Sequence, residues 1–142
     1  MGDELWIYFL GTNQDHSSRL DPAAQKHEST ISRAVMRLDG FVSADANYAG
    51  GSLTTPLLSF DGGRLELNLD TGAGGEVRVE LRDALGAPIP GFSVAEADVL
   101  NGNNVRMPVS WKGNQDVSKL AGKAVRLHFV MKDSRLYAFQ FR

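Results

Sequence analysis

Apolar and polar residues alternate strictly in two neighbouring segments of the chain. In residues 64–70 leucine occupies every second position, and in residues 76–82 valine and leucine do the same. Successive side chains of a strand point to opposite faces, so each segment is predicted to be a strand with one apolar face. The glycine-rich residues 71–75 between them are typical of a turn, and the two strands are therefore predicted to form a hairpin.

The same alternation recurs in other parts of the chain. Every second residue is apolar in residues 105–111, 125–131 and 137–141, and residues 4–10 and 29–37 also have strand-like patterns. Only residues 116–122 favour a helical turn, which Asp116 would cap and Gly122 would end. Many short strands without intervening helices predict an all-β fold, an antiparallel β-sandwich of the jelly-roll or concanavalin-like type.

Composition narrows the classes of function. Apolar residues make up 42% of the chain and charged residues 23%, as in ordinary globular proteins. The net charge of −2 gives no basic footprint for a nucleic acid, and no apolar stretch is long enough to cross a membrane. The absence of cysteine excludes disulfides and thiolate zinc sites. The N-terminal segment lacks the basic region of a signal peptide.

No catalytic constellation is evident. Glu66 and Glu80 could face each other across the predicted hairpin as a glycosidase pair, but the surrounding arginines favour a solvated charged face. His16 and His27 share a polar loop without the spacing of metal ligands. The chain is therefore predicted not to be an enzyme.

Calcium is the one cofactor that the sequence suggests. Sandwich modules hold Ca²⁺ with carboxylates and carbonyls from loops. Asp45 and Asn47 form one candidate pair, and Asn114 and Asp116 form another. The alternative is that Asp45 is a turn residue and Asp116 a helix cap, with no metal bound.

Glycan binding would need exposed aromatic rings beside polar side chains. Tyr48 lies in a loop rich in glycine and alanine, and is the best candidate for an exposed ring. The turn that contains Asn101, Asn103 and Asn104 supplies polar groups. Trp111 is a further candidate platform, although its place on an alternating apolar face favours a role in the core.

The N-terminal strands carry apolar side chains that need a covering surface. Trp6, Tyr8 and Leu10 share one face of the predicted first strand. If these strands do not pack on their own sandwich, they are expected to pair with another copy. The chain is therefore predicted to form a homo-oligomer with these residues at the interface.

Several segments together resemble a known module. Over residues 38–142 the chain resembles the C-terminal β-sandwich of bacterial five-bladed-propeller glycoside hydrolases of the invertase, levanase and arabinanase-like group. Residues 1–37 resemble the last strands of the propeller that precedes this module. The resemblance is carried by the segments RLDGFVSAD, GGSLTTPLLSF, RLELNLD, GAPIPGFS, VSWKGNQDVSKLAGKAVRLHFVMKD and LYAFQF.

The resemblance implies a division into residues 1–37 and residues 38–142. It implies a non-catalytic accessory sandwich, lectin-like if it binds carbohydrate, with a glycan or an upstream propeller domain as its partner. The catalytic carboxylates of such enzymes lie in earlier propeller blades, and nothing in this sequence matches their motifs. Proteins of this group are often secreted or periplasmic, and the chain itself leaves its compartment open.

Overall fold

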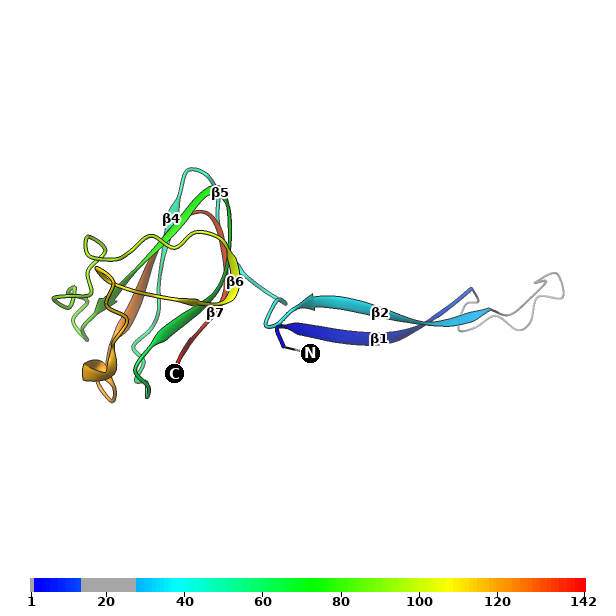
Figure 1. The fold of residues 1–142 in the computed structure, drawn as a ribbon, viewed down its shortest axis with the longest axis horizontal. Coiled ribbons are helices and arrows are strands. Elements are labelled where there is room, and N and C mark those ends of the chain that lie inside the picture. The colour runs from blue at the N-terminus through cyan, green and yellow to red at the C-terminus, as the bar shows by residue number, and fades with distance from the viewer. Residues whose placement is uncertain (1, 14–27) are drawn as a thin grey trace. The chain divides into compact units, whose positions relative to one another are not determined.

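The computed structural model describes residues 2–13 and 28–142 and divides the chain into two compact units, Met1–Leu38 and Asp39–Arg142. Each unit is built from antiparallel strands, and the described residues contain one short 3₁₀ turn but no α-helix (Figure 1). The predicted all-β fold is confirmed. No helix in the described part of the chain has the length and apolar character needed to span a membrane.

The first unit is a two-stranded ribbon. Strands β1 (Glu4–Thr12) and β2 (Ser29–Arg37) pair antiparallel along their whole length, from Glu4 opposite Arg37 to Thr12 opposite Ser29. Each strand has only the other as a hydrogen-bonded neighbour within the described residues. An isolated pair of strands is marginally stable in water at best, so the ribbon is the part of this fold that most needs additional packing.

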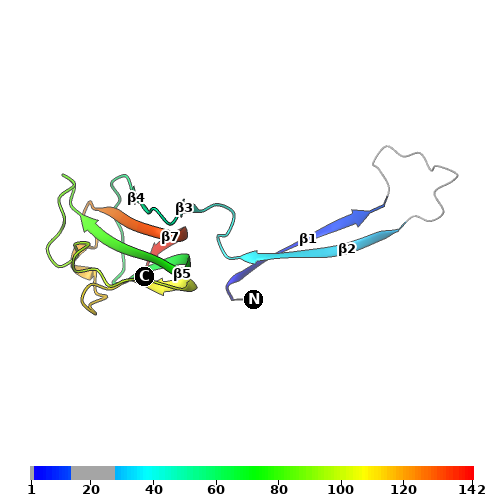
Figure 2. The ribbon, with the colours of Figure 1, turned by 90° about the horizontal axis from the view of Figure 1, so that it is seen from above.

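The second unit, which we call the sandwich unit, has five strands in the order β3-β7-β5-β6, with β4 also paired to β7. Two long strands, β5 and β7, form its centre and curve strongly, as Figure 2 shows. Strands β3 and β4 pair with successive parts of β7. The strands are β3 (Ala44–Ala46), β4 (Gly51–Thr54), β5 (Leu65–Arg82), β6 (Asn103–Pro108) and β7 (Arg126–Phe141).

The prediction that residues 64–70 and 76–82 form a hairpin is wrong. Both segments belong to the single strand β5, and both pair with β7. Residues 72–75 oppose Asp133 as an expanded bulge between the pairs Thr71–Ser134 and Glu76–Lys132. The glycines that favour a turn locally are used here to bend a continuous strand.

The core lies between the inner face of the long strands and the segments that cover it. Alternate residues are buried on both sides of the bulge in β5 and over residues 127–131 of β7, as their periodicity predicts. The alternating aromatic residues 137–141 are not buried in the same way, because Tyr137 and Phe141 are half-buried and Phe139 is exposed. Residues from the connecting segments complete the second layer of the sandwich-like fold. These buried residues of the second layer are Phe60, Phe92, Ala97, Leu100, Val109, Trp111, Val117, Leu120 and Val125.

Short local elements close the ends of the core. The 3₁₀ turn Ser118–Leu120 lies within the predicted helical segment, and the Asp116 carboxylate accepts a hydrogen bond of 2.9 Å from the Ser118 N–H. At the C-terminal end of β7, the Phe141 ring stacks on Phe60 with 3.7 Å between the ring centroids. The final aromatic strand therefore packs against the core with Phe141, while Phe139 stays 36% exposed.

Candidate binding site

A polar cleft of about 460 Å³ opens where β3, the bulge of β5 and the bend of β7 come together. Ligand pockets in proteins typically have volumes of roughly 300–1,000 Å³, so this cleft is large enough for a small ligand. Acidic, amide, hydroxyl and guanidinium groups all contribute to its wall. The lining residues are Asp45, Ala46, Asn47, Asp70, Thr71, Gly72, Asp133, Ser134 and Arg135.

The bulge of β5 is held in place by close contacts with β7. A Cβ atom on Gly72 would collide with the Asp133 carboxylate, and one on Gly75 would collide with the Asp133 carbonyl. Asp133 itself has a positive φ of 41°, and its N–H donates to the Asn47 carbonyl at 2.9 Å. At position 75 only glycine lets the two backbones approach this closely, which explains the glycine there.

Side-chain contacts from the segment before β6 fix the other edge of the bulge. The Asn101 amide donates to the Gly72 carbonyl at 3.3 Å and to the Gly75 carbonyl at 2.6 Å. The Thr71 hydroxyl accepts from the Gly102 N–H at 2.8 Å. These bonds satisfy backbone groups that the interrupted ladder leaves unpaired, so the shape of the cleft is largely preformed.

The cleft combines negative charge with one cation. A hydrogen bond with Tyr137 and the charges of Asp45 and Asp70 raise the pKa of Arg135 above its ordinary value. The Ser134 hydroxyl is buried and has no hydrogen-bond partner among the described residues. The cleft thus offers hydrogen-bond acceptors of high charge density beside a planar donor, a combination suited to a ligand with many hydroxyl groups.

An exposed aromatic ring borders this cleft. Tyr48 follows the cleft residue Asn47 and is 69% exposed. The Lys132 ammonium group lies 4.3 Å from the centroid of its ring, a cation–π contact that holds the ring in place. A Cβ atom on Gly74 would lie 3.8 Å from the ring edge, so Tyr48 stands beside the bulge of β5.

The other predicted glycan-binding residues have different roles. Asn101 supports the bulge, as described, and the Asn104 side chain accepts from the Arg106 N–H at 2.8 Å within β6. Asn103 pairs with Asp70 in the β5–β6 ladder. Trp111 is 2% exposed, so its prediction as a glycan platform is wrong. Its position on an alternating apolar face was the signal for this burial.

The predicted calcium ligands lie in two separate parts of the chain, with Asp45 in strand β3 and Asn47 directly after it, and with Asn114 and Asp116 before the 3₁₀ turn. The Asp45 carboxylate accepts from the Ser43 hydroxyl, and the Asn47 side chain accepts from the Ala49 N–H. The Asn114 side chain likewise accepts from the Asp116 N–H at 3.1 Å. Among the residues that the structure describes, no three His, Cys, Asp or Glu side chains gather closely enough to hold a metal ion. Asn47, Asn114 and Asp116 thus stabilise local turns, whereas Asp45 belongs to strand β3 and is not the turn residue that the alternative made it.

The predicted carboxylate pair does not face a common space. Glu66 and Glu80 lie near opposite ends of the same strand. Glu66 pairs with the Arg142 guanidinium at 3.1 Å, and Glu80 pairs with that of Arg82 at 2.7 Å. The loop with His16 and His27 lies outside the described residues.

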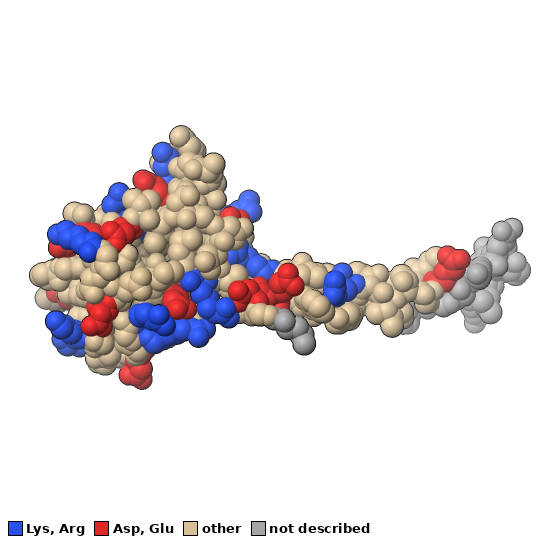
Figure 3. Space-filling view, in the orientation of Figure 1, with Lys and Arg blue, Asp and Glu red and all other residues tan. Residues whose placement is uncertain are grey.

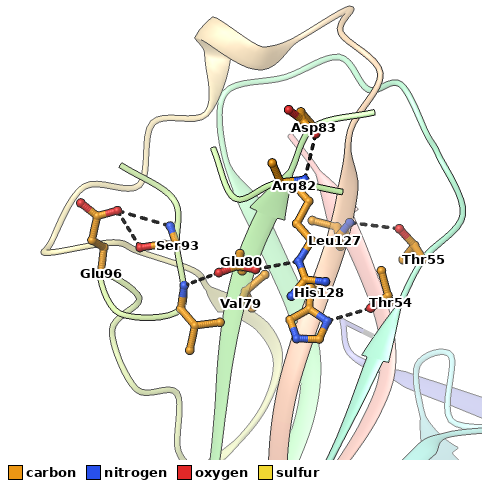
Figure 4. A network of polar contacts seen from close by, with 12 residues as sticks. Thr54, Thr55, Val79, Glu80, Arg82, Asp83, Ser93, Glu96, Leu127 and His128 are labelled. Carbon is orange, nitrogen blue, oxygen red and sulfur yellow. Dashed lines mark hydrogen bonds and ion pairs between the residues drawn. The ribbon is translucent and has the colours of Figure 1, made fainter. Parts of the chain in front are cut away.

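A polar network surrounds Glu80 on the outer side of β5 and β7 (Figure 4). Glu80 is directly opposite His128, and it accepts a hydrogen bond of 2.9 Å from the Val94 N–H. His128 Nδ1 and the Thr54 hydroxyl share a hydrogen bond of 2.7 Å. The network links β4, β5, β7 and the segment after β5, and it explains the polar residues on this face as a structural feature.

The network makes stability depend on pH. Burial lowers the pKa of His128 below its ordinary value of 6.5, and Arg82 lowers it further, while Glu80 acts in the opposite direction. The unfolded chain therefore binds this proton more readily, and stability is expected to fall as the pH decreases through 6.5 toward the lowered pKa. Thermal unfolding between pH 8 and 5.5 should show this loss, and His128→Gln should reduce it. An equal loss in the variant would contradict the assignment.

Comparison of this chain with protein-family models, with curated proteins and with solved structures finds no match. The resemblance to the sandwich of propeller glycoside hydrolases accordingly stays a prediction.

Proposed function

We propose that the chain is a non-catalytic β-sandwich module of a glycoside-hydrolase-like protein, and that it binds a glycan at the cleft beside Tyr48. The observation that carries this proposal is the exposed Tyr48 ring, which contacts Lys132 and stands next to the cleft residue Asn47 and the bulge of β5. Sugars present C–H groups on their ring faces and hydroxyl groups on their edges. An aromatic ring next to carboxylates complements both.

Each side of the site has a separate role in this proposal. The face of Tyr48 away from Lys132 would stack on the apolar face of a sugar ring. The carboxylates of Asp45 and Asp70 would accept hydrogen bonds from its hydroxyl groups, and Arg135 would donate to its oxygens. The bulge of β5 keeps these groups in one arrangement. This preorganisation lowers the entropic cost of ordering them when a glycan binds.

Tyr48→Ala is expected to weaken glycan binding about tenfold or more, which corresponds to ~1.4 kcal/mol. The substitution removes the stacking surface and leaves the sandwich core unchanged. Isothermal titration with fructan and arabinan oligosaccharides, after a survey on a glycan array, measures the effect. Phe41→Ala is the matched control, because Phe41 is 68% exposed, as Tyr48 is 69% exposed, but has no lining residue of the cleft as a chain neighbour, whereas Tyr48 directly follows the lining residue Asn47.

Two outcomes would contradict the proposal. Absence of binding across the array would leave the module with a structural role only. Equal weakening by Tyr48→Ala and Phe41→Ala would show that the bound glycan does not use this cleft.

A further inference from the structure

The two faces of the ribbon β1–β2 differ in charge. Directly opposed residues of an antiparallel pair share a face, so the register assigns every side chain to one side or the other. One face, here the charged face, carries Glu4, Arg33 and Arg37 among its apolar residues. The other, here the uncharged face, has no Asp, Glu, Lys or Arg within the strand residues 4–12 and 29–37. Its larger residues and their neighbours are Leu5, Ile7, Phe9, Ser32, Ala34 and Met36.

The charged face already uses its ionic groups within the ribbon. The Arg33 guanidinium lies 4.1 Å from the centroid of the Trp6 ring, and the Trp6 indole N–H donates to the Glu4 carboxylate at 2.8 Å. Burying this face against another surface would desolvate these charges. Two such faces brought together would also place arginines of one copy near those of the other.

Burying the uncharged face would neither desolvate charged groups nor bring arginines of two copies together. Ile7 is 42% exposed and Phe9 is 50% exposed, although both are large apolar side chains in the middle of a strand. In Figure 3 basic atoms are visible part-way along the ribbon, so the side drawn there includes part of the charged face. A surface without charges can pack on an identical surface without electrostatic repulsion.

We propose that a second copy of this chain covers the uncharged face, with the two ribbons packed face to face about a twofold axis. The contact is isologous, so each Phe9 packs against the equivalent surface of the other copy. Four strands in two layers then replace two isolated ribbons of marginal stability. The proposal moves the predicted interface from Trp6, Tyr8 and Leu10, on the charged face, to Ile7 and Phe9 on the other, and does not depend on glycan binding.

Adjacent residues on opposite faces provide a matched test. Phe9→Asp puts a carboxylate into the proposed contact and should raise the dimer dissociation constant about 100-fold or more. Tyr8→Asp adds the same charge at a side chain that is more exposed, 62% against 50%, and should leave the dimer intact. Light scattering over a concentration series up to high micromolar values measures the mass of each protein.

A second measurement covers the case in which Phe9→Asp unfolds the ribbon. The chain has no cysteine, so single-cysteine variants can be labelled with pyrene at one defined position. Ala34→Cys, on the uncharged face, should give excimer fluorescence, and Val35→Cys, on the charged face, should not. A monomeric mass for the unmodified chain, dissociation by Tyr8→Asp but not by Phe9→Asp, or excimer only at position 35 would overturn the proposal.

Discussion

Trp111→Ala is expected to destabilise the sandwich unit by about 3–5 kcal/mol, the usual cost of removing a buried large aromatic side chain. The Trp111 ring is 2% exposed and makes an edge-to-face contact with Phe92 at 5.0 Å between centroids. Its indole N–H also donates to the Val79 carbonyl at 2.8 Å. The substitution therefore leaves a cavity and an unpaired buried carbonyl near the C-terminal end of β5. Urea unfolding followed by circular dichroism measures the loss.

Trp111→Phe separates the two contributions. Phenylalanine keeps an aromatic ring in the core but cannot donate to Val79, so it should cost about 1–3 kcal/mol for the unsatisfied carbonyl and part of the lost volume. Trp6→Ala is the matched control, because Trp6 is 36% exposed and belongs to the ribbon. A loss below about 1 kcal/mol for Trp111→Ala would contradict its role in the core.

Periodicity predicted much of the sandwich unit because burial on one face of a strand is a local property. Leu127, Phe129 and Met131 alternate in the sequence, and all three are buried in β7. The alternation in both halves of β5 also corresponds to buried side chains. In such segments every second side chain contributes to the core, whichever strand is the partner. The alternation of apolar and polar residues therefore predicts burial without knowledge of the topology.

Pairing could not be predicted in the same way. Residues 71–75 favour a hairpin turn locally, but the actual partner of both flanking segments is β7, which is 44 residues further along the chain at Arg82 and 76 residues further at Leu65. The bulge is stabilised by Asp133 and Asn101, which are distant in sequence. Tertiary contacts thus override a local turn preference here.

The cleft depends on the same distant pairings. Asp45, Asp70 and Asp133 come from three strands, and only the register of β3 and β5 on β7 brings them to one place. The exposed ring of Tyr48 was predictable, because a tyrosine in a loop of small residues has little to pack against. Its place beside the cleft was not, because that follows from the bulge of β5.

Gly75→Ala is expected to open this bulge and to destabilise the sandwich unit by about 1–3 kcal/mol, as overpacking does at a rigid contact. The new Cβ atom would collide with the Asp133 carbonyl and lie 2.9 Å from the Thr71 Cβ. Backbone on both sides limits relaxation, so β5 and β7 must separate locally and the cleft loses its shape. Urea unfolding and glycan titration should both show the effect.

The neighbouring glycine provides a sharp control for this prediction. An added Cβ atom on Gly74 would meet only the edge of the Tyr48 ring, at an ordinary distance of 3.8 Å. Gly74→Ala should therefore keep the fold, and the lower entropy of its unfolded chain should offset any small cost. Equal stability of the two variants would show that β7 does not approach the bulge as closely as described. A normal glycan affinity in Gly75→Ala would show that the glycan does not bind at the cleft.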